Sequence, residues 1–310
     1  MSKENIVRIL GTGVATLDIY PKQKRMYPGG NEYNIACNAA FRGAEAAFLG
    51  VFADDLAGEI LESTLENVGV DASHSHHEEG SSGYSLVELK EDGDRIFLMW
   101  NKEGVTDLHP ITFTEDEITY VKGFDVICMG RLCCVSLDNI QRLNIQHQVP
   151  ICYDFHAAFT EKDIREIAPY ITYAFFSCWH LKEEEIRSTL KLAVERGCKI
   201  AVGTRGNESV IAYDGVDFYE QDTLNIEATD TLGAGDSFIA AFLVEYLKCM
   251  KNTDVREETM NETRQEKKII QHALAVATEH AANVIQMDGS IGVGFDFDPP
   301  TLEELIHVIS

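Results

Sequence analysis

Short apolar runs alternate with longer amphipathic stretches through most of this chain. Continuous apolar runs are typical of strands buried on both faces, and apolar positions at helical spacing are typical of helices that pack on a sheet. Their alternation predicts an α/β fold with a doubly wound, mainly parallel sheet. The expected strands are 6–10, 47–52, 126–129, 151–155, 173–176 and 200–203, and the expected helices are 56–68, 137–146, 163–170, 182–196, 233–250 and 266–285.

Residues 83–100 interrupt this alternation. Two strand-like runs, 84–89 and 95–100, flank Glu91-Asp92-Gly93-Asp94, which predicts a β-hairpin. The run 96–100 is apolar at every position, although a strand with one face in water should alternate. We therefore expect a subunit partner or a bound ligand to cover its second face. The earlier segment around Asp18 and Pro21 is interpreted as a loop.

Composition limits the classes of partner. The chain has 310 residues, which suits one large α/β domain with an appendage or two domains. Its 26 basic and 51 acidic residues give a net charge of -25, and such a field repels nucleic acids and anionic lipids. An anionic nucleotide would need local binding by backbone N–H groups, Mg²⁺ and a few basic side chains.

The cysteines predict a reducing compartment. The eight cysteines include no pair at CxxC spacing, and most lie in apolar runs where a free thiol behaves as a small hydrophobe. The sequence also has no apolar run of membrane-spanning length. We therefore expect a cytoplasmic protein with free cysteines.

The segment Asp230-Thr231-Leu232-Gly233-Ala234-Gly235-Asp236-Ser237-Phe238 carries the strongest chemical signal. Its two glycines let the backbone approach a ligand, and the apolar helix that follows directs its first N–H groups into the loop. Those N–H groups suit a phosphate, and a carboxylate at Asp236 could take a proton from an attacking hydroxyl. The alternative is a glycine-rich loop in which Asp236 only caps the helix.

This segment resembles the C-terminal signature of the ribokinase/PfkB carbohydrate kinase family. Gly29-Gly30-Asn31-Glu32-Tyr33-Asn34-Ile35-Ala36 is similar to the family's first signature, and Asp18 to its sugar-chelating aspartate. The resemblance spans roughly residues 6–295. It implies a single ribokinase-like domain over 1–310, a small β-hairpin or β-sheet lid from about 12–30 and 83–107, and transfer of the γ-phosphate of ATP to a sugar hydroxyl.

The resemblance also assigns roles to individual residues. Asp236 would be the catalytic base, and Gly233, Ala234 and Gly235 would stabilise the transferred group through their N–H groups. Asp18, Gly29, Gly30 and Asn34 would hold the sugar, and Thr204 and Gly206 the nucleotide beside Gly233 and Gly235. Mg²⁺ would bridge the phosphates, and oxygens of Asp230 and Leu232, with carbonyls of Val284, Met287 and Gly289, would hold a monovalent cation such as K⁺.

Two departures from the family pattern bear on the substrate. Ser177 occupies the Asn position of the NxxE element linked to Mg²⁺, and the D-x-N-x-R element reads Asp154-Phe155-His156-Ala157-Ala158, without its Arg. Both features look like the fructoselysine-6-kinase branch. Arg131 follows an expected strand and carries a guanidinium suited to a carboxylate, so we expect it to recognise the amino-acid end of a fructosamine. The alternative is a surface arginine that balances an acidic chain.

Alternatives remain open at this point. A fructokinase, a 2-keto-3-deoxygluconate kinase or a nucleoside kinase would share these signatures, and a non-catalytic sugar-binding regulator could keep the fold. A dinucleotide-binding oxidoreductase is disfavoured, because Thr16 stands where the third glycine of that turn belongs. The apolar hairpin predicts a homodimer in which the lids cover each other.

Overall fold

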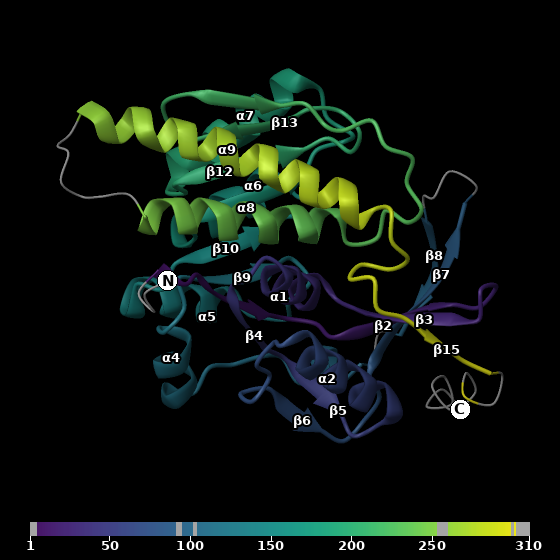
Figure 1. The fold of residues 1–310 in the computed structure, drawn as a ribbon. Helices are drawn as coiled ribbons and strands as arrows, with labels where there is room; N and C mark the ends of the chain where they lie inside the picture. The colour runs from purple at the N-terminus through teal and green to yellow at the C-terminus, as the bar shows by residue number, and fades with distance from the viewer. Residues whose placement is uncertain (1–4, 91–94, 102–103, 253–259, 299–300, 302–310) are drawn as a thin grey trace.

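An eight-stranded sheet forms the centre of the molecule (Figure 1). The computed structural model describes residues 5–90, 95–101, 104–252, 260–298 and 301. The strand order is β14-β13-β12-β11-β10-β9-β1-β4. Neighbouring strands pair in parallel from β12 across to β4, whereas the β12–β13 and β13–β14 pairs are antiparallel. The mainly parallel sheet predicted from the sequence is therefore confirmed. Its strands are β1 (Arg8–Thr12), β4 (Glu45–Leu49), β9 (Val126–Gly130), β10 (Ile151–Asp154), β11 (Tyr173–Ser177), β12 (Ile200–Thr204), β13 (Val210–Tyr213) and β14 (Phe218–Gln221).

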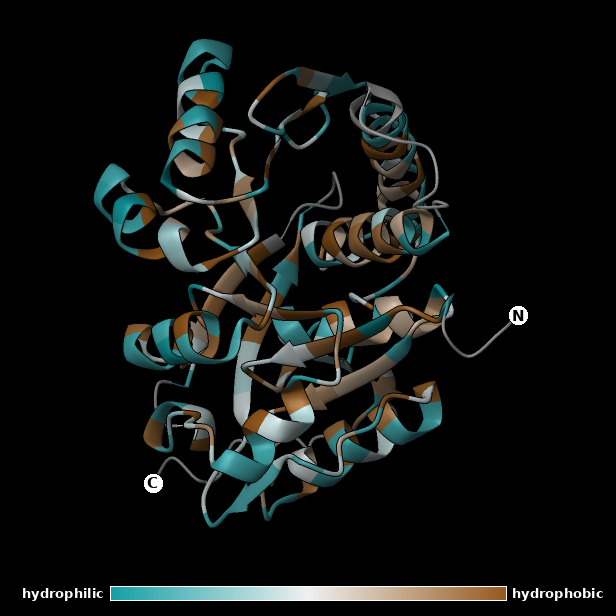
Figure 2. Cartoon of the chain, turned by 90° about the vertical axis from the view of Figure 1, so that its left-hand side faces the viewer, coloured by the Kyte–Doolittle hydropathy of each residue, from teal (hydrophilic) through white to brown (hydrophobic). Residues whose placement is uncertain are grey.

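Helices cover both faces of this sheet. Along β9, Val126 and Cys128 pack with residues of α1, α2, α8 and α9, whereas Ile127 and Met129 pack with residues of α4 to α7. This alternation follows from the two-residue period of a strand. Figure 2 shows helices with hydrophobic residues on one side and hydrophilic residues on the other. The helices are α1 (Asn31–Phe41), α2 (Leu56–Val68), α3 (Val105–Leu108), α4 (Glu115–Val121), α5 (Leu137–Gln141), α6 (Glu161–Ile167), α7 (Glu183–Arg196), α8 (Ala234–Lys251) and α9 (Met260–Val284).

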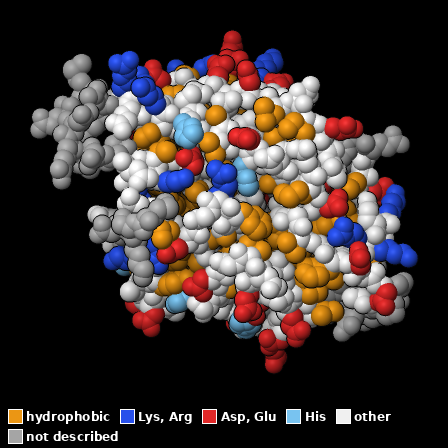
Figure 3. All heavy atoms as spheres, in the orientation of Figure 1, with side chains coloured by type: hydrophobic (Ala, Val, Ile, Leu, Met, Phe, Trp, Pro, Cys, Tyr) orange, Lys and Arg blue, Asp and Glu red, His pale blue; other side chains and the backbone are white. Residues whose placement is uncertain are grey.

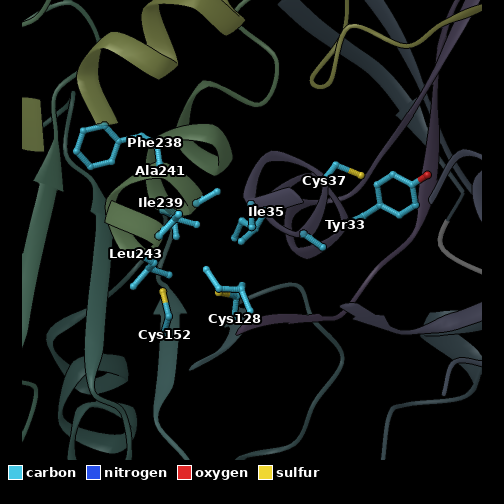
Figure 4. Packing of buried hydrophobic residues seen from close by; sticks show 14 of the residues in the cluster. Tyr33, Ile35, Cys37, Cys128, Cys152, Phe238, Ile239, Ala241 and Leu243 are labelled. Carbon is cyan, nitrogen blue, oxygen red and sulfur yellow. The ribbon is translucent and has the colours of Figure 1, made fainter. Parts of the chain in front are cut away.

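The core beside α1 and α8 holds the catalytic candidates in place. Ile35 of α1 and Ile239 and Leu243 of α8 lie with Cys128 and Cys152 of the sheet (Figure 4). These side chains are at most 3% exposed, and both thiols are free. The expectation that such cysteines serve as small hydrophobes is confirmed.

A second sheet, in the order β15-β3-β2-β7-β8, stands at one side of the main sheet (Figure 1). The segment interpreted as a loop around Asp18 and Pro21 instead forms the antiparallel strands β2 (Thr16–Tyr20) and β3 (Arg25–Gly29). That expectation was wrong because β2 carries a buried Asp18, which breaks its apolar pattern. The predicted hairpin is confirmed as β7 (Gly83–Leu89) and β8 (Arg95–Trp100), although its turn, 91–94, lies outside the described residues.

A β-bulge changes which face of the sheet the side chains of β8 point to. Phe97 pairs with Val87 and Met99 with Leu86, so Leu98 is an additional residue in β8. The extra residue changes the alternation, so Phe97 and Trp100 both line the same cavity although they are three positions apart. Residues 96 to 100 are between 38% and 58% exposed, so no described part of the same chain provides the covering expected for this strand.

The remaining elements differ little from the predicted ones. A short sheet pairs β5 (Val51–Ala53) with β6 (His76–Glu78), and β15 (Phe295–Asp296) completes the second sheet. α5 continues into a π-helical turn, and α9 begins at Met260, several residues before the predicted start. No helix in the described part of the chain is long and apolar enough to cross a bilayer.

Candidate active site

A cavity of about 920 Å³ opens between the main sheet, the start of α8 and the second sheet. It lies at the carboxyl ends of the parallel strands, where open α/β sheets place their ligands. Asp154, Ser177 and Thr204 reach it from the ends of β10, β11 and β12. The second sheet contributes Asp18, Tyr84, Phe97 and Trp100, and the segment before and inside α8 contributes Thr231 to Asp236.

The first turn of α8 presents backbone N–H groups to this cavity. Gly233 caps the helix with a φ of 73°, and the N–H of Ser237 donates to its carbonyl at 2.8 Å. The N–H groups before Ser237 therefore have no carbonyl within the helix to bond, and that of Ala234 makes only a long bond, 3.4 Å, to the Thr231 carbonyl. A Cβ at Gly233 would lie 2.5 Å from Cβ of Ser290, whereas a Cβ at Gly235 would meet nothing within 4 Å. Gly233 shapes the turn, and Gly235 leaves open space for a ligand.

Asp236 is a buried carboxylate held by two amides. Its Oδ1 accepts from Asn31 at 3.0 Å, its Oδ2 accepts from Asn34 at 2.8 Å, and it is 5% exposed. Burial raises the pKa of Asp236 to about 6, and the charge of Asp154 adds to this increase while the two amides oppose it. A carboxylate with this pKa is ionised at neutral pH and is basic enough to take a proton from a hydroxyl as that group attacks.

Ser290 connects this carboxylate to the C-terminal part of the chain. Its hydroxyl donates to Asn34 Oδ1 at 2.7 Å, which fixes the orientation in which the Asn34 amide donates to Asp236. The sequence reasoning assigned Asn34 to the sugar but identified neither Asn31 nor Ser290. Asn31 lies inside the first signature and could have been noticed there, whereas Ser290 lies 256 positions beyond Asn34 and leaves no local signal.

Asp18 and the paired glycines lie together, as predicted. Asp18 is 4% exposed and lines the cavity, and a Cβ at Gly29 would lie 2.6 Å from its Oδ2. Gly30 has a φ of 114°, and a Cβ there would lie 2.1 Å from the Val14 carbonyl oxygen. Both glycines are therefore required by the packing of the chain itself.

Two buried polar atoms without partners face each other across Gly130. Among the described residues, neither Oε1 of Glu32 nor Nε2 of His156 has a hydrogen-bond partner. A Cβ at Gly130 would lie 3.0 Å from the first atom and 3.2 Å from the second. Burial raises the pKa of Glu32 to about 8, with further increases from Asp236 and Asp154. Unpaired buried groups of this kind are costly, so they mark a place where a ligand or water is expected.

His156 is held in a strained conformation by Asp154. Its φ is 54°, its N–H donates to Asp154 Oδ1 at 2.8 Å, and its Nδ1 lies 3.5 Å from Oδ2 of the same carboxylate. Burial raises the pKa of Asp154, and the nearby imidazole opposes that increase. The residue takes the Asn position of the family's D-x-N-x-R element, and its imidazole lines the cavity. Backbone strain is typically retained where it serves a site.

The cavity is acidic. The described residues that line it include the carboxylates of Asp18, Asp107, Asp154 and Asp236 and one imidazole, but neither a lysine nor an arginine. Such a surface suits Mg²⁺, which prefers oxygen ligands and commonly binds through carboxylates and substrate phosphates together. Polyphosphate binding here would depend on that ion and on the N–H groups of α8.

Of the two other residues expected to bind the nucleotide, Thr204 and Gly206, only the first lines the cavity. Thr204 lines the cavity, and Gly206 follows it with a φ of 65° in an exposed turn, where a Cβ would meet nothing within 4 Å. Ser177 lines the cavity, but the acids that follow it are engaged at α7: Glu185 accepts from the Lys182 N–H, and Glu183 pairs with Arg187. Their part in placing Mg²⁺ stays a prediction.

The residues expected around a monovalent cation lie together. The Asp230 carboxylate accepts from Tyr20 at 2.9 Å, from the Leu232 N–H at 2.9 Å and from the Gly289 N–H at 3.1 Å. It thereby ties the loop before α8 to the second sheet and to the segment after α9. Three protein donors already bond this carboxylate, so a cation there would bind mainly carbonyl oxygens. That role for Asp230 and Leu232 stays a prediction.

Arg131 lies outside the described lining of the cavity. Its guanidinium pairs with Asp163 at 3.1 Å, and its side chain is 41% exposed. The next residue, Leu132, does line the cavity and is 57% exposed. The recognition of a substrate carboxylate by Arg131 stays a prediction, and it would require the guanidinium to be shared with Asp163.

Sequence relatives match this chain over most of its length. The family model described as pfkB family carbohydrate kinase matches residues 11–293. Fructosamine kinase FrlD of Bacillus subtilis is 32% identical over 291 residues, covering 94% of this chain and 95% of the relative. Fructoselysine 6-kinase of Escherichia coli is 29% identical over 227 residues, covering 73% and 84% respectively.

Solved structures confirm the ribokinase-like fold. Ribokinase of Giardia lamblia aligns with a TM-score of 0.74 at 16% identity, over 92% of this chain and 95% of that one. Arabidopsis thaliana ribokinase, complexed with ribose and ATP, aligns with a TM-score of 0.72 at 18% identity, over 92% and 94%. The match of the family model covers both signatures and the loop that carries Asp236. This chain belongs to the pfkB family of carbohydrate kinases.

Proposed function

We propose that this protein transfers the γ-phosphate of ATP to a hydroxyl of a fructosamine, a fructose linked through its C1 carbon to an amine. The observation that carries the proposal is Asp236, a buried carboxylate beside the open N–H groups of α8 and inside an acidic cavity. A base next to an anion-binding helix start is what phosphoryl transfer to a hydroxyl requires. The ATP-bound ribokinase relative and the two fructosamine-type relatives support the choice of substrates.

The acidic cavity favours an amine-bearing sugar over an acidic one. A fructosamine carries a secondary amine that is cationic near neutral pH, and four carboxylates complement it. Asp107, on α3, is the exposed member of this set. A sugar acid such as 2-keto-3-deoxygluconate would instead place its carboxylate among these four without a described lysine or arginine to pair with it.

Asp236 and the start of α8 perform the transfer. The carboxylate takes the proton of the attacking hydroxyl as the new O–P bond forms and the bond from the γ-phosphorus to ADP breaks. The N–H groups from Gly233 to Asp236 stabilise charge on the transferring group, at several kcal/mol for a well-placed donor. Mg²⁺ bound to the phosphates would neutralise their charge among the carboxylates. A monovalent cation such as K⁺ near Asp230 would stiffen this loop.

His156 stands at the Asn position of the D-x-N-x-R element, and Ala158 stands at the position of its arginine. Nε2 of His156 is buried and lacks a partner among the described residues, and Nδ1 faces the Asp154 carboxylate. An imidazole oriented in this way would donate from Nε2 to an oxygen in the cavity when both ring nitrogens carry a proton. We place this donor on the phosphate side, because Asp154 and Ser177 reach the cavity from neighbouring strands there.

The second sheet would act as a lid and as the dimer interface. Within the domain proposed for 1–310, four of its strands, β2, β3, β7 and β8, fall in the ranges 12–30 and 83–107, and Phe97 and Trp100 of β8 line the cavity. Excluding water favours transfer to the sugar over hydrolysis of ATP. The exposed side chains of β8 that do not reach the cavity would pack against the same strand of a second copy.

The proposed function is tested by coupled kinase assays on the purified chain. We expect ADP to form with fructoselysine at a kcat/KM at least about tenfold above that with fructose, a difference of about 1.4 kcal/mol. Asp107→Asn should raise the KM for fructoselysine and leave that for fructose unchanged. Asp138→Asn removes the same charge from an exposed position outside the cavity and serves as the control. Equal turnover of fructose and fructoselysine by wild type would reject the fructosamine assignment, and no sugar-dependent ADP formation would reject kinase activity.

A further inference from the structure

Three metal-ligating side chains meet between the C-terminal half of α8 and the middle of α9, away from the active site. Glu245 and Cys249 lie one turn apart on α8, and His272 reaches them from α9. The three candidate ligand atoms all lie within 4.8 Å of one another. The two helices run side by side, and histidine, acidic and basic side chains lie together over them (Figures 1 and 3).

One oxygen of Glu245 is shared by the other two groups. Oε1 lies 3.6 Å from Sγ of Cys249 and 3.2 Å from Nε2 of His272. The other oxygen, Oε2, faces Arg42 and Lys248, each at 3.8 Å. The two cations therefore attract the carboxylate from one side and leave Oε1 turned towards the thiol and the imidazole.

These separations match those around a tetrahedral zinc ion. With bonds of about 2.3 Å to sulfur and about 2.0 Å to nitrogen or oxygen, such an ion holds sulfur and oxygen ligands about 3.5 Å apart and nitrogen and oxygen ligands about 3.3 Å apart. The observed 3.6 Å and 3.2 Å each lie within about 0.1 Å of these values, and Sγ of Cys249 lies within 4.8 Å of a ring nitrogen of His272. Thiolate, imidazole and carboxylate together are a ligand set for Zn²⁺ and similar borderline ions, whereas Mg²⁺ prefers oxygen alone.

We propose that Glu245, Cys249 and His272 form a binding site for a divalent transition-metal ion such as Zn²⁺, with water as its fourth ligand. The site is separate from the Mg²⁺ and phosphate chemistry of the cavity, because none of its three residues lines that cavity. Binding would join α8, which carries Asp236 at its start, to α9.

The metal-free arrangement is one that the ion can replace. The Cys249 thiol donates to Oε1 of Glu245. An ion at the common point of the three groups displaces that proton and bonds the resulting thiolate. Glu245 is 9% exposed, while the His272 side chain is 55% exposed, so an entry path exists through the imidazole.

Cobalt provides a direct test, because Co²⁺ takes zinc's place and its absorption reports both thiolate bonding and tetrahedral geometry. The full chain without an affinity tag, freed of metal with EDTA, is titrated with Co²⁺ in the absence of nucleotide. We expect a thiolate-to-cobalt charge-transfer band and tetrahedral ligand-field bands that saturate at one ion per chain. Added Zn²⁺ should remove both.

Variants assign the site. Cys249→Ser should abolish the charge-transfer band, and His272→Gln should weaken cobalt binding by at least about tenfold, since even loss of an outer partner costs about 10–100-fold. Cys134→Ser is the matched control, because Cys134 is also a half-buried thiol, 3.8 Å from the Asp107 carboxylate. A band that survives in Cys249→Ser or disappears in Cys134→Ser overturns the proposal, as does the absence of any cobalt binding at micromolar concentrations by wild type.

Discussion

Two strands of similar composition have opposite surroundings in this molecule. β9, Val126–Gly130, is buried at every position because helices of the same chain cover both faces of the main sheet. Positions 96–100 of β8 are exposed at every position, because no element among the described residues covers the second sheet there. Apolar content alone therefore does not tell a core strand from a recognition strand. Changes on the main sheet should affect folding or the chemical step, and changes on β8 should affect association and substrate capture.

The largest effect is expected at the catalytic end of the main sheet. Asp236→Asn keeps the size of the side chain but removes the base, so kcat should fall by about 10²–10⁴-fold while ATP binding is retained. In wild type, kcat should rise with pH through about 6, because the raised pKa of Asp236 makes it protonated and inactive below that value. The pH profile of kcat for both enzymes checks this. A variant with near-normal turnover would remove Asp236 from the mechanism.

Substitutions at the two glycines at the start of α8 should affect different properties: catalysis at Gly235 and stability at Gly233. Gly235→Ala adds a methyl group to open space, so stability should be kept or rise by about 0.4–1 kcal/mol while kcat/KM falls by about tenfold or more. Gly233→Ala is strained by its φ of 73° and contacts Ser290, so it should lose about 1–3 kcal/mol of stability. Urea unfolding and kinase assays on both variants give the comparison. Equal loss of stability in the two would contradict the assignment of open space at Gly235.

A charge on β8 should affect assembly and spare the fold. Leu98 is 54% exposed, so Leu98→Asp should leave the free energy of unfolding of the monomer within about 0.5 kcal/mol but convert a dimer to monomers. Light scattering at micromolar concentration measures the mass. Ile145→Asp is the control, because Ile145 is 63% exposed and lies in the π-helical turn after α5, outside the second sheet. This variant should remain dimeric. A wild-type chain that is already monomeric would contradict the proposed interface.

The smallest effect is expected at Arg131. Its ion pair with Asp163 is exposed, so its contribution to recognising a substrate carboxylate should be about 0.2–1 kcal/mol, or up to about fivefold in selectivity. Arg131→Met should lower the preference for fructoselysine over fructose by this factor, measured as the ratio of the two kcat/KM values. Unchanged selectivity would show that Arg131 takes no part in recognition.

The sequence predicted what depends on neighbours in the chain. Alternating apolar runs predicted the parallel sheet, and the glycines before α8 predicted the turn that presents Asp236. The apolar pattern did not predict β2 as a strand, because the buried Asp18 interrupts it; only the family resemblance implied a small β-sheet over this segment. It also missed Ser290 as the support of Asn34, since that contact depends only on the tertiary fold. The acidity of the cavity was hidden for the same reason, because its carboxylates come from separate elements.

The hydrogen bond from Ser290 to Asn34 has a consequence for the order in which this protein becomes active during synthesis. Asn34 and Asp236 leave the ribosome well before Ser290 does, and the loop at Asp230 is tied to Gly289 only after α9 has been made. A nascent chain that ends before residue 289 contains every strand of the main sheet but lacks the hydroxyl that orients the Asn34 amide towards Asp236. We therefore expect competence for phosphoryl transfer to arise only after the last strand and helix of the main layer have been made.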